Sequence, residues 1–133
     1  MTSIDLEPRS YRVTREDLMA YAAASGDQNP IHQDPDIARS VGLPGVIAHG
    51  MFTLALVGRY LEECGVPVDD VAELGGKFVK PVVVPAAGAE VTMLGALRGH
   101  HDQAGDRRTI SVEVVCDGVK VFGPRGARVR LRD

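Results

Sequence analysis

The chain has 133 residues, 44% of them hydrophobic and 25% charged, and a formal net charge of −3. Length and composition are those of a globular domain and exclude a disordered tail or a coiled coil. The negative charge argues against a protein that binds nucleic acid by neutralising phosphates, and no apolar run is long enough to cross a membrane. The first residues lack the features of a signal peptide, and no linker or repeat divides the sequence. We therefore expect one cytoplasmic domain over residues 1–133, with no nucleic-acid or membrane partner.

The first part of the chain is predicted to begin with a short strand and continue as helices. The strand covers residues 10–13, and the first helix is capped by Thr14 and ends near Gly26. A second short helix begins at Asp34 and Pro35, a common pair at helix starts.

The longest predicted helix covers residues 49–64 and ends before Gly65 and Pro67. Residues 51–57 in its interior are apolar on every face. Since a surface helix would show a polar stripe, we expect other structure to surround this helix on all sides.

The rest of the chain favours strands, because it is rich in Val and Thr and contains no further helical pattern. Asp117-Gly118 predicts a hairpin turn, and residues 99–106 are interpreted as a loop. The architecture is then α+β, an antiparallel sheet of four or five strands curled around one apolar helix. The predicted strands are residues 77–84, 90–97, 108–116, 119–122 and 127–131.

A carboxylate and an imidazole lie five residues apart between the first two helices. Asp27 and His32 enclose Asn29 and Pro30, and the proline fixes a turn from which both side chains can be aimed. Such a pair can hold one water molecule and transfer protons near neutral pH. Surface turns and helix caps have the same spacing, so the residues alone leave both interpretations open.

His49, Gly50 and Met51 begin the longest helix. The free backbone N–H groups at a helix start can stabilise a polarised carbonyl, and glycine lets a ligand approach the backbone. The alternative is that His49 caps the helix and Gly50 only permits tight packing.

The remaining histidines and cysteines do not form a metal-binding pattern, because no pair with ligand spacing has a matching second pair. We expect His100 and His101 to be solvated in the predicted loop. Cys64 and Cys116 lie in apolar patterns and are expected to pack as small hydrophobic residues.

Three sequence blocks resemble a known family. YAAASGDQNPIH at residues 21–32, with Ala38 following after five residues, and IAHGM at 47–51 are similar to the signature of the MaoC-like (R)-specific enoyl-thioester hydratase/dehydratase family. IARSVGLPGVIAHGM and FVKPVVVP, at residues 78–85, are most similar to actinobacterial (3R)-hydroxyacyl-thioester dehydratase subunits. The resemblance covers about residues 10–98.

The resemblance implies a single hotdog domain, an antiparallel sheet wrapped around a buried central helix. It implies reversible hydration of trans-2-enoyl thioesters, or dehydration of (R)-3-hydroxyacyl thioesters, carried on coenzyme A or acyl carrier protein in fatty-acid or polyketide-type metabolism. No metal and no organic cofactor is implied.

The resemblance also implies roles for the residues that match its motifs. Asp27 and His32 hold the water and transfer the proton, and the N–H of Gly50 binds the thioester carbonyl. Asn29 orients the loop. We expect the two neighbours of Gly50, His49 and Met51, to bind substrate.

One position departs from the family pattern. Some relatives carry a serine eight residues after the glycine of the HGM block, where this chain has Gly58. This leaves chain-length preference open but does not affect the proposed dyad. Two alternatives to a hydratase remain, a thioesterase and a non-catalytic subunit that completes a partner's acyl tunnel.

Oligomerisation is expected because a sheet of about five strands leaves its edge strands unpaired. A homodimer is favoured because the chain carries its own Asp27 and His32, and a heterodimer with a related subunit is the alternative.

The last predicted strand is basic. Arg128, Arg130 and Arg132 alternate with apolar residues, so they are predicted to share one face, and Lys120 and Arg125 precede them. This face is either a solvated surface that protects a sheet edge or a site that attracts the phosphates of coenzyme A or an acidic carrier protein.

Overall fold

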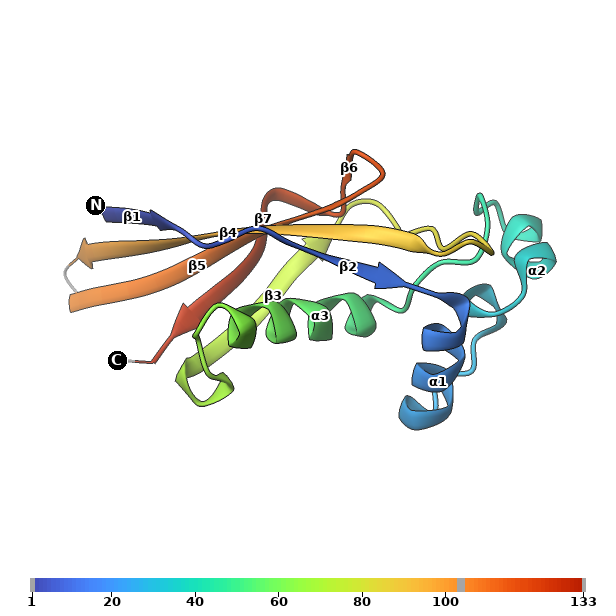
Figure 1. The fold of residues 1–133 in the computed structure, drawn as a ribbon, viewed down its shortest axis with the longest axis horizontal. Coiled ribbons are helices and arrows are strands. Elements are labelled where there is room, and N and C mark those ends of the chain that lie inside the picture. Colours follow the sequence, from blue (N-terminus) through green and yellow to red (C-terminus); the bar gives the residue numbers. More distant parts are fainter. Residues whose placement is uncertain (1, 103–104, 133) are drawn as a thin grey trace.

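The computed structural model describes residues 2–102 and 105–132. Its strands form one antiparallel sheet of order β1-β4-β5-β7-β3, in which β2 also pairs with β4 and β6 with β5. The strands are β1 (Thr2–Asp5), β2 (Arg9–Val13), β3 (Val71–Phe78), β4 (Ala89–Asp102), β5 (Gly105–Cys116), β6 (Val119–Lys120) and β7 (Phe122–Leu131). Figure 1 shows that β4 and β5 form the long axis of the sheet.

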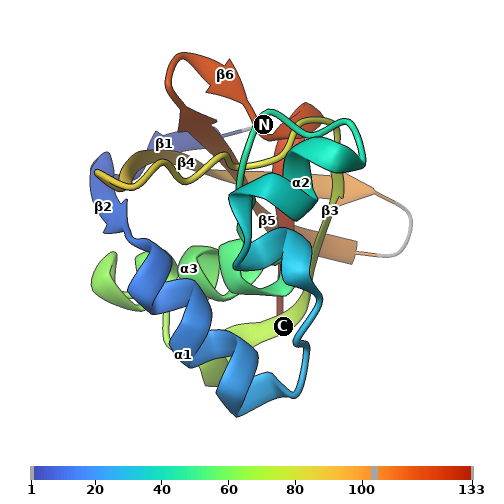
Figure 2. The same cartoon turned by 90° about the vertical axis from the view of Figure 1, so that its right-hand side faces the viewer.

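The helices lie on one side of the sheet and at one of its ends. The longest helix, α3, runs along the sheet, and the two shorter helices α1 and α2 gather at the end where α3 begins (Figures 1 and 2). The helices are α1 (Arg15–Ser25), α2 (Pro35–Ser40) and α3 (Gly50–Glu63), with 3₁₀ turns η1 (Pro30–His32) and η2 (Val68–Asp70). No helix in the described part of the chain is long and apolar enough to span a membrane.

The predicted caps of the first two helices are confirmed. The Thr14 hydroxyl accepts from the Asp17 N–H and the Asp17 carboxylate accepts from the Thr14 N–H, which is a capping box. Gly26 ends α1 with a φ of 81°, a left-handed conformation that glycine adopts without strain. The Asp34 carboxylate accepts from the first N–H groups of α2. Together these caps fix both ends of the segment between α1 and α2.

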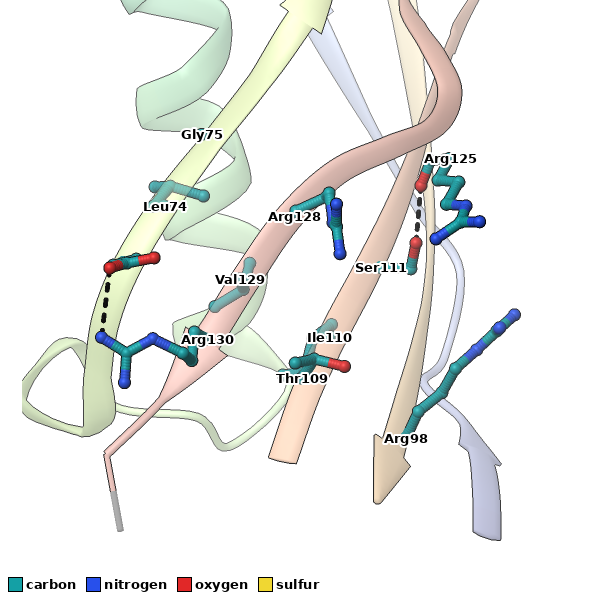
Figure 3. A pocket seen from close by; sticks show the side chains of 11 residues that line it. Leu74, Gly75, Arg98, Thr109, Ile110, Ser111, Arg125, Arg128, Val129 and Arg130 are labelled. Carbon is teal, nitrogen blue, oxygen red and sulfur yellow. Dashed lines mark hydrogen bonds and ion pairs between the residues drawn. The ribbon is translucent and has the colours of Figure 1, made fainter. Parts of the chain in front are cut away.

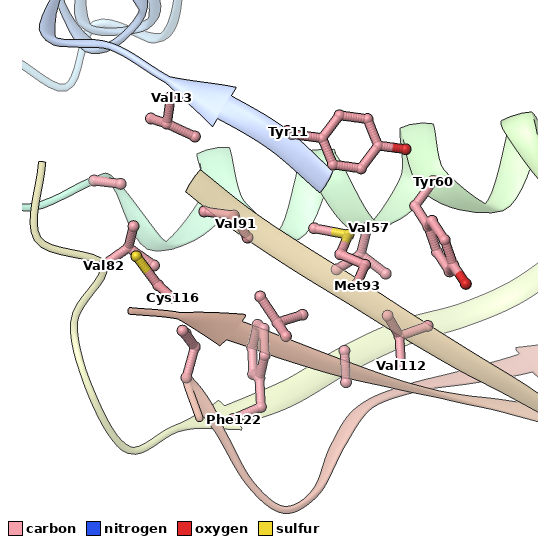
Figure 4. Close-up of a cluster of buried hydrophobic side chains, with 14 of the residues drawn as sticks. Tyr11, Val13, Val57, Tyr60, Val82, Val91, Met93, Val112, Cys116 and Phe122 are labelled. Carbon is pink, nitrogen blue, oxygen red and sulfur yellow. The ribbon is translucent and has the colours of Figure 1, made fainter. Parts of the chain in front are cut away.

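The hydrophobic core lies between α3 and the inner face of the sheet (Figure 4). Val57 and Leu61 of α3 pack against the sheet, together with the fully buried Tyr60. The Tyr60 hydroxyl donates to the Glu7 carbonyl at 2.9 Å and accepts from the Gly95 N–H at 3.0 Å. Burial raises the pKa of Tyr60 to about 12, so this hydroxyl stays protonated and joins α3 to β4.

The two cysteines differ in burial. Cys116 is buried in the core, as predicted, and burial raises the pKa of its thiol. Cys64 is half-buried and packs against the edge of the core.

The predicted enclosure of the central helix on all sides is wrong for this chain. Met51 is 63% exposed and Ala55 is also exposed, so α3 has an apolar face that the chain leaves uncovered. The remaining faces of the helix meet the core through Val57 and Leu61.

The predicted strand over residues 77–84 is also wrong. β3 begins earlier, at Val71, and ends at Phe78. The segment after it forms a short antiparallel contact with the chain before α3, in which Ala48 N–H donates to the Val82 carbonyl at 2.9 Å and Val84 N–H to the Val46 carbonyl at 2.8 Å. Because Pro81 lacks an N–H, it cannot continue a strand ladder, and the chain changes partner there.

The predicted loop over residues 99–106 is instead the end of a long hairpin. β4 and β5 pair until Asp102 faces Gly105. Residues 103 and 104 of the predicted loop lie outside the described residues. The ladder between the two strands continues through polar residues that carry no apolar alternation, which explains why the sequence pattern missed it.

Three smaller differences concern the sheet. β1 was not predicted, the strand expected over 119–122 is divided between β6 and the start of β7, and the strand expected over 127–131 is the second half of β7. These changes lengthen the sheet but keep the predicted α+β architecture.

Candidate active site

The loop between α1 and α2 is held by consecutive side-chain to backbone hydrogen bonds. The Asn29 N–H donates to Asp27 Oδ1 at 3.3 Å, and the Ile31 N–H donates to Asn29 Oδ1 at 3.2 Å, which caps η1. The Asp27 N–H donates to Ser25 Oγ at 3.1 Å. These local hydrogen bonds stabilise a turn, and the turn fixes the position of the exposed Asp27 carboxylate.

His32 follows at the end of η1 and is only 7% exposed. Its Nδ1 lies 2.7 Å from the Ile47 carbonyl oxygen. Since a carbonyl can only accept, Nδ1 carries the proton, and Nε2 of the neutral ring keeps a lone pair. Ile47 is itself fixed, because its N–H donates to the Ile31 carbonyl and it pairs with Val83.

His49 lies behind His32 and is 2% exposed. The two imidazoles are stacked, with ring centroids 3.8 Å apart and planes 23° apart. His49 Nε2 donates to the Asp27 backbone carbonyl at 3.1 Å. The Tyr21 and His49 rings form a T-shaped pair with ring centroids 4.7 Å apart. His49 thus contacts both members of the Asp27–His32 pair.

The polar groups of Asp27, His32 and His49 lie within 4.8 Å of one another. This cluster does not have the geometry of a metal site. The stacked rings direct their lone pairs along nearly parallel planes, whereas metal ligands converge on one point.

Gly50 opens α3 beside a cavity of about 330 Å³. The N–H groups of the first turn of a helix have no acceptor within the helix, so they are available to a ligand. A Cβ on Gly50 would lie 3.2 Å from the Phe78 ring. The cavity is lined by His32, Ile47, Ala48, Gly50, Thr53, Phe78, Val79, Lys80, Pro81, Val82 and Val121.

The structure therefore brings His32 and Gly50 to one cavity, with the Asp27 carboxylate beside His32. His49 and Met51 do not line this cavity; His49 is behind His32, and Met51 is on the exposed face of α3.

Sequence reasoning gave a role to only His32 and Gly50 among the lining residues, and Thr53, Phe78 and Lys80 are among those it missed. Phe78 and Lys80 lie in the FVKPVVVP block, whose resemblance to the family was the only sequence signal for them. The resemblance assigned no role to the side chains of this block.

Gly58 lies on α3, at the position where some relatives carry serine. A Cβ added to this glycine would meet no other atom within 4 Å. A serine would therefore fit there without displacing a neighbour, so the glycine is not required by packing.

Comparison with known proteins identifies the family. A family model described as the MaoC like domain matches residues 3–119. The chain is 44% identical over 75 residues to 3-hydroxyacyl-thioester dehydratase X of Mycobacterium tuberculosis, covering 56% of this chain and 26% of that protein. It is 39% identical over 72 residues to dehydratase Y of the same organism, covering 52% and 25%. The chain thus spans about a quarter of the length of these two relatives.

Solved structures agree with this result. A MaoC-like dehydratase superposes with a TM-score of 0.89 at 32% identity, over 99% of this chain and 40% of that chain. An (R)-hydratase from A. caviae superposes with a TM-score of 0.74 at 22% identity, over 98% and 93%. The curled antiparallel sheet with α3 along its inner face is the hotdog fold that these structures share. The chain belongs to the MaoC-like domain family.

Proposed function

We propose that this chain catalyses the reversible hydration of trans-2-enoyl thioesters to (R)-3-hydroxyacyl thioesters. One observation carries the proposal: the hydrogen bond from His32 Nδ1 to the Ile47 carbonyl leaves Nε2 as a proton acceptor at the cavity that Gly50 also lines. A base and a set of free backbone N–H groups on one cavity suit addition to a conjugated carbonyl. The dehydratase and hydratase names of the relatives support the same reaction.

In the proposed mechanism, the N–H of Gly50 and the start of α3 bind the thioester oxygen. This polarises the carbonyl, so C3 of the enoyl chain becomes electrophilic. Asp27 and His32 hold a water molecule whose oxygen forms a bond to C3. One proton of the water leaves to the dyad, and one proton is delivered to C2, so that the elements of water are added across the double bond. Dehydration is the reverse, and these groups suffice without a cofactor.

The apolar walls of the cavity suit an acyl chain. Phe78, Val79 and Val82 line it, and Thr53 adds a hydroxyl near the start of α3. Small-molecule pockets are commonly apolar with a few polar groups that fix orientation. The carrier of the thioester, coenzyme A or acyl carrier protein, is the part of the substrate that lies beyond this cavity.

We propose that the active unit is a dimer. β3 is an end strand of the sheet, and Phe78 and Val79 at its end are 43% and 48% exposed beside the cavity. Met51 of α3 is a further exposed apolar side chain, and it follows Gly50, which lies against the Phe78 ring. A second chain paired along β3 would cover an unpaired edge and these apolar groups. We favour an identical chain, because Asp27 and His32 come from one chain.

A heterodimer with a related subunit is the alternative for the partner. The ChsH1-ChsH2 complex of Mycobacterium tuberculosis has the same fold, with a TM-score of 0.80 at 20% identity. Mass determination by light scattering on the purified chain distinguishes the two: a stable, active monomer contradicts any dimer, and activity that appears only with a second subunit supports the heterodimer.

The function is tested by following the loss of enoyl absorbance when the purified chain is mixed with crotonyl-CoA. Hydration by the wild type that is absent in Asp27→Asn is the expected result. Release of free thiol without loss of the enoyl group would indicate a thioesterase instead, and no reaction with any carrier would indicate a non-catalytic subunit.

A further inference from the structure

A second cavity, of about 650 Å³, lies on the outer face of the sheet (Figure 3). The side chains of Ala127, Val129 and Leu131 of β7 are buried toward α3, whereas Arg128 and Arg130 are exposed on the opposite face. We call this hollow the arginine cleft; its charged lining residues are Glu73, Arg98, Arg125, Arg128 and Arg130.

The register of the sheet explains why the face is hollow. Arg128 lies opposite Gly75 on β3 and opposite Ser111 on β5. Directly opposite residues of an antiparallel pair point to the same face, so Arg128 has small neighbours on both sides. The adjacent row holds longer side chains, since Arg130 faces Thr109, which in turn faces Arg98. Small residues thus form the floor, and arginine side chains form the walls.

The charges in the cleft are unbalanced. Arg130 pairs with Glu73 at 3.2 Å, and this is the one ion pair among the cleft residues in the described part of the chain. Among the side chains that the structure describes, which leave out residues 100–107 and 133, Arg98, Arg125 and Arg128 have no carboxylate partner. The described lining of the cleft thus holds four arginines and one glutamate, on a chain whose net charge is −3. Clustered like charges repel each other, and arginine forms a fork of donors that matches phosphate oxygens.

We infer that the arginine cleft binds a nucleotide with two or more phosphate groups. Positive side chains on β4 and β7 stand on both sides of the hollow, which suits an extended anion better than a single ion. The Ser111 hydroxyl, which donates to the Arg125 carbonyl, and the Thr109 hydroxyl supply neutral polar groups on the floor. The volume lies within the range of small-ligand pockets, whereas a carrier protein would need a broad and flatter contact.

Two sources of such a ligand share this chemistry, the nucleotide end of coenzyme A and a free nucleotide. Within one chain the cleft is remote from the dyad, because Glu73 lies five residues before Phe78, or about 17 Å along β3, and the cleft opens on the other face of the sheet. Antiparallel pairing of β3 with β3 of a second copy would bring the Glu73 end of the strand in one copy toward the Phe78 end in the other, with both clefts on the same face of the joined sheet. The inference that the cleft binds a nucleotide does not depend on the proposed function. The inference that this nucleotide is part of coenzyme A does depend on it.

The binding is tested by calorimetric titration of the full chain with adenosine 3′,5′-bisphosphate, ADP and pyrophosphate, at about 0.05 M and about 0.3 M salt. The variant Arg98→Gln/Arg128→Gln removes two walls of the cleft. We expect its Kd for the bisphosphate to be about 100-fold weaker at low salt, since each charge-assisted hydrogen bond contributes about tenfold. The control Arg39→Gln/Lys120→Gln removes the same charge from surface ion pairs elsewhere and should keep the wild-type Kd.

The result that overturns the inference is either no binding of the three ligands to the wild type at low salt or an equal loss in both double variants. Melting temperatures of the variants show whether the fold is intact, and because all four substituted side chains are exposed, no loss of folding is expected.

The source is tested by kinetics with crotonyl-CoA and with crotonyl-N-acetylcysteamine, a thioester without a nucleotide. If the cleft holds the end of coenzyme A, Arg98→Gln/Arg128→Gln lowers kcat/KM for crotonyl-CoA alone. If nucleotide binding is lost and both substrates react normally, the ligand is a free nucleotide. If the wild type converts neither thioester, the proposed function fails, and the titration still decides whether the cleft binds nucleotides.

Discussion

The cavity lined by His32 and Gly50, which we call the dyad cavity, and the arginine cleft are built in opposite ways. In the dyad cavity, the groups assigned to the reaction are held by the backbone: His32 by the Ile47 carbonyl, Asp27 by the Asn29 N–H, and the free N–H groups by the start of α3. In the arginine cleft, long exposed side chains stand on the outer face of the sheet with few fixed partners. Proton transfer needs groups held in place, whereas attraction of an anion needs only charge at the right distance. We therefore expect single substitutions in the dyad cavity to lower turnover strongly. Substitutions in the arginine cleft should change ligand affinity in proportion to the charge removed.

The largest effect is expected for the dyad. Asp27→Asn and His32→Ala should each lower kcat for crotonyl-CoA hydration by about 10²- to 10⁴-fold, the range for a lost general acid or base. Thermal melts should show little loss of stability for Asp27→Asn, because this side chain is exposed. Near-native activity in either variant would remove the dyad assignment.

Gly50→Val should have the next largest effect. A Cβ at this position already lies 3.2 Å from the Phe78 ring, so a branched side chain must displace the ring and fill the approach to the helix start. We expect kcat/KM to fall by about 10²-fold, similar to the loss of one oxyanion donor. Gly50→Ala is the matched control, because the Phe78 ring can shift by a few tenths of an ångström for one methyl group. Wild-type turnover by Gly50→Val would place carbonyl binding elsewhere.

His49→Phe tests whether His49 positions the dyad. Phenylalanine preserves a ring that can stack on His32 but cannot donate to the Asp27 carbonyl. We expect kcat to fall by about tenfold, since small misplacements of a reacting group have effects of this size or larger. KM should stay unchanged, because His49 does not line the cavity. A raised KM with normal kcat would instead support the sequence-based expectation that His49 binds substrate.

Local sequence patterns were sufficient to predict one part of this structure, the ends of the first two helices. Thr14, Asp34 and Gly26 act within a few residues of themselves, so caps and helix ends could be predicted from local patterns. Asp27, His32 and Gly50 were candidates from their residue types and positions, and the resemblance to a family gave them roles. The contact between His32 and His49 could not be predicted in the same way, because 17 positions separate them. The contact depends on hydrogen bonds of Ile47 to Ile31 and His32 and on its pairing with Val83.

The errors in the fold have a common cause as well. The apolar residues after Phe78 form a run typical of a strand, yet they pair with the chain before α3 instead of continuing β3. β3 itself was assigned only in part because Gly75 and Gly76 weaken its strand pattern. In α3, apolar residues on all faces predicted enclosure, but the sequence cannot state whether the same chain or a second one covers Met51. Long-range pairing decided the strands, and the packing of the whole chain decided which face of α3 is covered.

The smallest expected effect has the opposite sign and concerns Glu73, the acidic side chain that lines the arginine cleft. Glu73→Gln removes the partner of Arg130, whose ion pair is exposed and therefore contributes little to stability. With this negative charge gone, the potential in the cleft becomes more positive, and Arg130 is free to turn toward a ligand. One unit charge several ångströms from a phosphate in a solvated site changes its binding by about two- to threefold. We therefore expect Glu73→Gln to bind adenosine 3′,5′-bisphosphate about two- to threefold more tightly at low salt and equally well at high salt, where exposed charges are screened. Calorimetric titration measures both values. Weaker binding by this variant would mean that Glu73 contacts the ligand or holds Arg130 in the position that binds it, and the cleft would then resemble the dyad cavity in depending on fixed geometry.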